Sequence, residues 1–265
     1  MPKTTKVHYF IKQNAEALSF AAADWIATSV ADAIAAKGVA RIAISGGSTP
    51  KRSFELLADP KQPFRSRIDW ARLLLFWVDE RCVPPDHSDS NYRMTRETLL
   101  SKVPLPEQNI VRMEGELDPE EAASRYESAL RTQFRLEGAE VPRFDLIQLG
   151  MGDDGHTASL FPHSAALDSM MRLVVANHVQ AKDSWRITLT WPVINHAGKV
   201  FFLIQGAAKA GVLHDVFQGP YQPETWPSQL IRPSSGELFL LLDDAAAAQL
   251  PSPGADGSGI LEVTR

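Results

Sequence analysis

The sequence is poor in cysteine, because its 265 residues contain only Cys82. A single thiol excludes an internal disulfide and is typical of proteins from a reducing cytoplasm. The amino terminus, MPKTTKVHYF, also lacks the apolar core of a secretory signal peptide. We therefore expect a cytoplasmic protein.

Long apolar runs and clusters of basic residues are scarce too. Apolar runs such as residues 73–78 and 238–242 are far too short to span a bilayer. The formal net charge is −5 and no long basic block occurs, so we expect neither a membrane nor a nucleic acid as partner. An apolar content of 44% is ordinary for a globular protein, and the chain is long enough to bury a core.

Strand-like apolar segments alternate with helix-like segments along the chain. This pattern predicts an α/β fold with a doubly wound, mainly parallel sheet and helices on both faces, as in Rossmann-like proteins. No linker divides the chain, which predicts a single domain over residues 1–250. Residues 251–265 begin with a stretch rich in Pro, Ser and Gly, and we expect them to form a flexible tail. The predicted strands cover residues 6–11, 39–44, 73–78, 144–149, 172–175, 186–190, 200–205 and 237–242.

Several predicted helices have recognisable ends. Asn14 is a candidate N-cap for a helix that Gly38 would end. Asp118-Pro119, followed by two glutamates, is typical of a helix start, and that helix should end near residue 138. We also expect helices over residues 51–58, after residue 206 and over residues 243–250, whereas residues 84–91 should form a loop.

Four of the predicted strands end in residues suited to chemistry. The segments that follow these strands are SGGSTP (residues 45–50), DER (79–81), GMGDDGH (150–156) and GAAK (206–209). The carboxyl ends of parallel strands lie at one edge of a sheet, and open α/β sheets bind their ligands there. We therefore expect these segments to form one site.

The first segment has the composition of an anion cradle. Its glycines, Gly46 and Gly47, allow backbone N–H groups to turn toward a ligand, and Ser48 and Thr49 add donors at a helix start. No Gly-Lys-Ser/Thr follows, so it is not a Walker loop. The alternative is a plain turn in which a hydroxyl caps the helix. At the other strand ends, Arg81 and Lys209 are candidate cations for the same anion, or else partners of nearby acids.

The GMGDDGH segment matches the G-x-G-x-x-G dinucleotide pattern but does not suit a dinucleotide. Asp153 and Asp154 place negative charge where a pyrophosphate needs donors, and no acid for the ribose follows about 20 residues later. His156 is instead a candidate general base that a neighbouring carboxylate could orient, with simple packing as the alternative. Asp79 and Glu80 are either acid–base groups or ion-pair partners of an arginine.

With these motifs assembled, the chain resembles the 6-phosphogluconolactonases, which share a superfamily with glucosamine-6-phosphate deaminase/isomerase. The resemblance covers residues 39–246, and it implies a NagB-type fold. Deaminases carry a tyrosine where Arg81 stands. The TASLFP segment after His156 is similar to that of the lactonases. After its proline, His163 replaces the glycine that is usual in lactonases. The motifs are ISGGSTP (44–50), WVDERCVPPDHSDSNYRM (77–94), LGMGDDGHTASLFP (149–162), RITLTWPVIN (186–195) and GAAKA (206–210).

The resemblance implies hydrolysis of 6-phospho-D-glucono-1,5-lactone to 6-phospho-D-gluconate in the oxidative pentose phosphate pathway, without a metal or cofactor. It implies His156 as general base, Asp154 as its orienting partner and Asp79 as a further catalytic candidate. Alternatives are a deaminase/isomerase, or a sugar-phosphate sensor, although no basic DNA-binding module precedes the domain. We expect a monomer or homodimer. The implied substrate-binding residues are Gly46, Gly47, Ser48, Thr49, Arg81 and Lys209.

Overall fold

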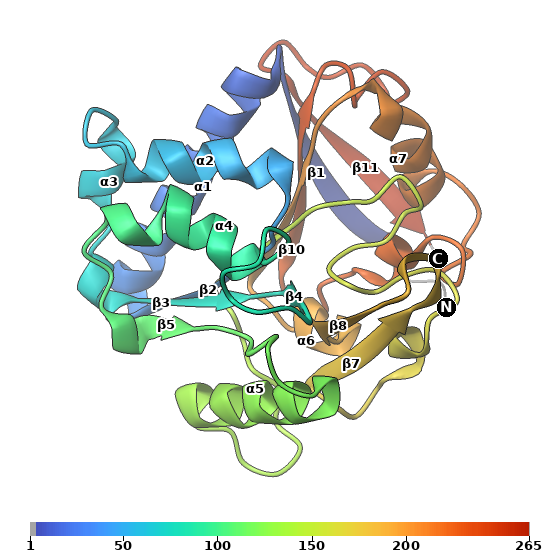
Figure 1. Cartoon of the computed structure of the whole chain (residues 1–265). Coiled ribbons are helices and arrows are strands. Elements are labelled where there is room, and N and C mark those ends of the chain that lie inside the picture. Colours follow the sequence, from blue (N-terminus) through green and yellow to red (C-terminus); the bar gives the residue numbers. More distant parts are fainter. Residues whose placement is uncertain (1–3, 265) are drawn as a thin grey trace.

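The computed structural model describes residues 4–264, and an eight-stranded sheet runs through the molecule (Figure 1). The strand order is β11-β1-β10-β9-β6-β2-β3-β5. Neighbouring strands are parallel throughout, except that β11 runs antiparallel to β1. The predicted α/β fold is therefore confirmed. The strands are β1 (Thr4–Lys12), β2 (Ala40–Ile44), β3 (Leu73–Trp77), β5 (Ile110–Val111), β6 (Leu146–Leu149), β9 (Lys199–Ile204), β10 (Glu237–Asp243) and β11 (Ser258–Thr264).

Two hydrophobic cores lie on opposite faces of this sheet. Alternate residues of a strand point to opposite faces, so in β9 Phe202 belongs to one core and Phe201 to the other. Helices α1 (Ala15–Lys37) and α2 (Ser48–Ala58) cover the Phe201 side, with α3 (Pro63–Arg67) beside them. Helices α5 (Pro119–Phe134) and α7 (Ala210–Phe217) cover the Phe202 side.

Helix α1 begins and ends where the sequence predicts. The Asn14 side chain accepts a hydrogen bond from the Ala17 N–H at 2.9 Å, and Gly38 ends the helix in the left-handed conformation at φ 77°. By length and composition alone α1 could cross a membrane, but half of its apolar window is buried within the molecule. That burial is expected of a helix that covers a sheet.

Helix α5 also begins as predicted but ends earlier. The Asp118 carboxylate accepts from two N–H groups of the first turn, and Pro119 occupies the first helical position. Arg135 takes the left-handed conformation at φ 54° and ends the helix before residue 138. Three helices were not predicted, namely α3, α4 (Asn91–Thr98) and α6 (Trp191–Asn195).

A second, three-stranded sheet lies beside the main one (Figure 1). It contains β4 (Asp79–Arg81), β8 (Ser184–Leu189) and β7 (Val174–Val179), and its strands are antiparallel. The sequence predicts strands near β7 and β8 but places them in a parallel sheet. The turn between them spans only residues 180–183, which is enough for an antiparallel hairpin and too short for a parallel crossover.

The carboxyl-terminal part of the chain differs from the prediction in two ways. Residues 258–264 are not a flexible tail, because β11 pairs with β1 and buries Leu261 and Val263. The alternation of these residues with exposed neighbours is a strand pattern that the Pro- and Gly-rich residues before it obscure. The helix predicted over residues 243–250 is absent as well. Asp243 ends β10, and its carboxylate accepts from the N–H groups of Gly206 and Ala246.

Candidate active site

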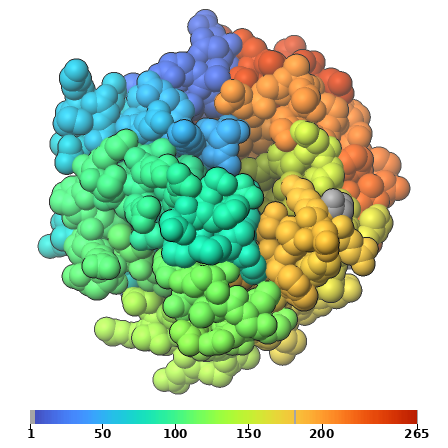
Figure 2. Space-filling model, viewed as in Figure 1, coloured from blue at the N-terminus to red at the C-terminus, as the bar shows by residue number. Residues whose placement is uncertain are grey.

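The four chemically unusual strand ends meet at one cavity. Strands β9, β6, β2 and β3 are consecutive neighbours in the sheet, so the segments that follow them share its carboxyl edge. They line a cavity of about 440 Å³, which opens in the hollow between the blue, yellow-green and gold segments of Figure 2. Of the predicted site residues, the cavity is lined by Gly46, Gly47, Ser48, Thr49, Asp79, Arg81, His156 and Lys209.

The amino terminus of α2 forms one side of the cavity. Gly47 precedes the helix at φ 99°, a left-handed value that favours glycine, and no side chain caps the helix. The first N–H groups of α2 therefore have no side-chain acceptor. Ser48 and Thr49, at this end of the helix, line the cavity. Gly46 packs so closely against Asn91 that a Cβ would lie 1.8 Å from the amide oxygen. A larger residue there would force the Asn91 side chain to move.

His156 stands at the end of a tight glycine turn. The Gly152 N–H donates to the His156 carbonyl at 2.9 Å, and the Gly155 N–H donates to the Gly152 carbonyl at 3.1 Å. Gly155 has a φ of 73°, and a Cβ on Gly152 would lie 2.0 Å from Nδ1 of His156. The glycines therefore allow the imidazole to fold back on its own turn.

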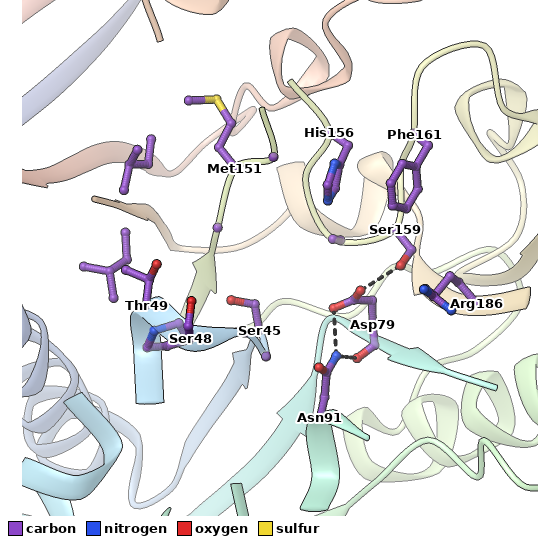
Figure 3. Close-up of a pocket in the computed structure, with 18 of the residues that line it drawn as sticks. Ser45, Ser48, Thr49, Asp79, Asn91, Met151, His156, Ser159, Phe161 and Arg186 are labelled. Atoms are coloured by element: carbon purple, nitrogen blue, oxygen red, sulfur yellow. Dashed lines mark hydrogen bonds between the residues drawn. The ribbon is translucent and has the colours of Figure 1, made fainter. Parts of the chain in front are cut away.

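Asp154 lies behind the imidazole and fixes its tautomer. Its Oδ1 lies 2.5 Å from Nδ1 of His156. Partial burial pushes the pKa of Asp154 upward, but the hydrogen bond and the charge of His156 outweigh it and lower the pKa to about 2. An ionised carboxylate only accepts, so Nδ1 carries a proton, and whenever the ring is neutral Nε2 holds a lone pair. Phe161 stacks on the ring at 4.1 Å between centroids and fixes its plane (Figure 3).

Asp79 and Glu80, which sequence reasoning left unresolved, occupy different environments. Asp79 lines the cavity while only 7% exposed. Its Oδ2 accepts from the Ser159 hydroxyl at 2.7 Å, and its Oδ1 lies 3.4 Å from the Asn91 amide nitrogen (Figure 3). The carboxylate is thus fixed in place at the cavity wall, where a substrate could contact it.

Glu80 serves the start of α4 and is absent from the cavity lining. Its carboxylate accepts from the N–H groups of Arg81, Asn91 and Tyr92, each at 2.8 Å, and from the Ser90 hydroxyl at 3.1 Å. Burial raises the pKa of Glu80, and the backbone N–H donors oppose that effect. Glu80 therefore anchors the residues that bear Asn91 and Arg81.

Arg81 and Arg186 lie directly opposite each other on β4 and β8. Both line the cavity, and within residues 4–264 neither forms an ion pair with a carboxylate. Burial and the neighbouring Arg81 charge lower the pKa of Arg186. Sequence reasoning missed Arg186, because only the pairing of β8 with β4, a strand far earlier in the sequence, brings it beside Arg81. Adjacent Cys82 is not activated by these charges, since burial raises the pKa of its thiol to about 11.

Lys209 is the one predicted cation that has an acidic partner. Its Nζ donates to Oδ1 of Asp153 at 2.5 Å, so the ion-pair alternative holds although the side chain still lines the cavity. Figure 3 shows Ser48 and Thr49 on one side of the cavity and Arg186 on the other, with His156 and Asp79 between them. Groups that attract anions therefore stand on both sides of the imidazole.

Comparison with known proteins identifies the family. A family model described as glucosamine-6-phosphate isomerases/6-phosphogluconolactonase matches residues 13–240. The chain belongs to this family. A family relative from Synechocystis, named 6-phosphogluconolactonase, is 44% identical over 226 residues, which cover 85% of this chain and 90% of the relative.

Solved structures of the family have the same fold. A 6-phosphogluconolactonase from Trypanosoma cruzi superposes with a TM-score of 0.81 at 30% identity, covering 94% of this chain and 98% of its own. A monomeric glucosamine-6-phosphate deaminase superposes with a TM-score of 0.75 at 19% identity, covering 91% and 99%. This second likeness shows the fold alone, so the fold does not separate the two activities.

Proposed function

We propose that the chain hydrolyses 6-phospho-D-glucono-1,5-lactone to 6-phospho-D-gluconate, the lactonase step of the oxidative pentose phosphate pathway, in the cytoplasm. The observation that carries this proposal is the His156–Asp154 pair. His156 lines a cavity together with the anion cradle at the start of α2 and with Arg81 and Arg186. The Arg81 and TASLFP signatures and the 44% identical relative named 6-phosphogluconolactonase support the same choice.

His156 acts as the general base in this proposal. Its Nε2 removes a proton from water while the water oxygen attacks C1 of the lactone. Asp154 stabilises the imidazolium, which then gives its proton to the ring oxygen as the bond from C1 to that oxygen breaks. General-base catalysis of this kind contributes about 10²–10⁴-fold. Asp79, whose carboxylate is held by Ser159 and Asn91, accepts a hydrogen bond from a sugar hydroxyl.

The oxyanion that forms at C1 needs N–H donors. The N–H groups of Gly152 and Gly155 already donate within the turn, so they are not free for this role. The donors in this proposal are therefore other N–H groups of the cavity wall.

The phosphate binds away from the reacting carbon. In this proposal the amino terminus of α2, with Ser48 and Thr49, acts together with Arg81 and Lys209 to hold it. A helix amino terminus and a guanidinium both suit a dianion. Binding energy from this remote group positions the lactone for attack.

The deciding experiment measures lactone opening above its spontaneous rate, together with ammonia release from glucosamine 6-phosphate. We expect fast lactone hydrolysis and no ammonia. His156→Ala should lower kcat about 10²–10⁴-fold with little change in KM, whereas His163→Ala, at an exposed histidine nearby, should leave kcat intact. Ammonia release without lactone hydrolysis would show a deaminase, and a ligand-dependent thermal shift without turnover of either substrate would show a sensor.

A further inference from the structure

A segment far from the glycine turn in sequence packs against its back. Trp226 lies so close to Gly155 that a Cβ on the glycine would sit 2.6 Å from Cε3 of the indole and 3.3 Å from the Trp226 Cα. Two residues later, the Ser228 N–H donates to the Gly155 carbonyl at 2.9 Å. The turn that carries His156 therefore rests on residues 226–228 through one ring contact and one hydrogen bond.

Gln229 ties these residues to the body of the protein. Its side chain is 2% exposed. Its amide nitrogen donates to the carbonyl of Asp215 in α7 at 3.0 Å and to that of Pro220 at 2.9 Å, and its amide oxygen accepts from the Gln222 N–H at 2.6 Å. A buried amide with all of these partners fixes the segment rigidly. Residues 220–229 are hereafter called the bracket.

The same turn is also held by the residue before α7. Lys209 donates to Asp153, which directly precedes Asp154. The bracket and Lys209 thus hold the turn at two residues, Gly155 and Asp153, and both are anchored at α7. Because the imidazole folds back onto Gly152, a small shift of the turn would move the ring and its carboxylate partner.

We propose that Trp226 is a positioning residue for His156: the bracket holds the glycine turn so that the imidazole and Asp154 keep their short hydrogen bond. This inference rests on the role of His156 proposed above. Trp226 does not line the cavity, so it acts on the reaction only through the turn.

The test uses Trp226→Ala, with steady-state kinetics on the phosphorylated lactone and proton NMR of the low-field Nδ1 proton of His156. We expect kcat to fall about 10- to 100-fold, because displacement of a catalytic group slows the reaction, while KM changes less than about three-fold. The Nδ1 resonance should broaden or disappear. Trp226→Phe should restore part of both signals, since it keeps a flat aromatic ring beside Gly155 but lacks the benzo ring of the indole, to which Cε3 and Cζ3 belong.

A matched control separates positioning from stability. Trp70 is a buried tryptophan, whereas Trp226 is half-buried, and Trp70 lies beside α3, away from the cavity. Trp70→Ala should lower Tm and leave kcat and the Nδ1 resonance unchanged. If Trp226→Ala behaves like Trp70→Ala, the inference is wrong. If His156→Ala itself retains kcat, the proposed function fails instead, and the two failures are distinguishable.

Gly155→Ala tests the same contact by adding a methyl group to the turn, and it leaves the indole of Trp226 in place. Its Cβ would collide with the Trp226 ring, and alanine is in addition strained at the φ of 73°, so kcat should fall and the Nδ1 resonance should weaken. In Gly155→Ala/Trp226→Ala the ring is gone, and the combined loss should be clearly smaller than the product of the two single losses. Losses that multiply would overturn the inference, because they would show no coupling across this contact.

Discussion

At the scale of single residues, the ionised state of Asp154 has a measurable pH signature. Its pKa is lowered to about 2 from an ordinary value of 3.8. A carboxylate with a lowered pKa stabilises the folded state above its unfolded pKa and loses that contribution as the pH falls through the folded value. The Tm advantage of the wild type over Asp154→Asn should therefore be present at pH 5 and shrink from pH 4 to pH 2. Thermal denaturation of both proteins across this range checks it, and a constant difference would contradict it.

The two facing arginines predict selectivity for the phosphorylated substrate. Loss of a hydrogen bond to a charged group costs about 1.5–3 kcal/mol. Arg81→Ala should therefore raise KM for the phosphorylated lactone about ten-fold or more, and Arg186→Ala, which removes the guanidinium opposite, should act in the same direction. Neither change should alter turnover of unphosphorylated gluconolactone.

The control for this prediction is Arg96→Ala, which removes an exposed charge from α4 outside the cavity. It should leave the kinetics with both substrates unchanged. If Arg186→Ala lowers activity on both lactones by the same factor, Arg186 acts at the reacting carbon and not on the phosphate.

Much of the candidate site follows from the sequence, and its gaps have physical reasons. His156 and Ser48 directly follow predicted parallel strands, so the fold class alone brings them to one edge. The position of Arg186 beside Arg81 depends on the antiparallel pairing of β8 with β4, two strands far apart in sequence, which no local pattern specifies. The partner of Lys209 likewise depends on how two loops meet, and the sequence does not show this.

At the scale of elements, the contact between the loop before α2 and the start of α4 should be intolerant of added volume. In Gly46→Ala the new methyl group would overlap the Asn91 side chain, and overpacking typically costs about 1–3 kcal/mol. We expect this loss of unfolding free energy in urea, together with reduced activity. Gly211→Ala in α7 is the matched control: no atom lies within 4 Å of its Cβ, so it should be neutral or stabilising.

The elements that the sequence predicts well are those with local signals. Asn14 and Asp118 cap their helices as expected, and the parallel strands are short apolar runs. Helix α4 was missed because its amino terminus is held by Glu80, which precedes it by several residues, in addition to its own Ser90 cap. Such support from a neighbouring strand is tertiary and leaves no periodic pattern.

At the scale of the whole molecule, β11 should contribute to stability. Removal of residues 258–265 would expose one edge of β1 and delete the buried Leu261 and Val263. Burial of such side chains is worth about 1.5–3 kcal/mol each, so the truncated protein should lose several degrees of Tm. Its kcat per folded molecule should stay the same, since β11 and the site strands lie apart in the strand order. An unchanged Tm would support the flexible tail that the sequence suggests.

The position of β1 also bears on how the chain folds during synthesis. The first strand to be made lies between β10 and β11, the last two. Strands β2, β3, β6 and β9 could assemble around the cavity while β1 has no partner on either side. Synthesis proceeds from the amino terminus, so β1 must stay unpaired, and available to the wrong edges, until β10 has been made.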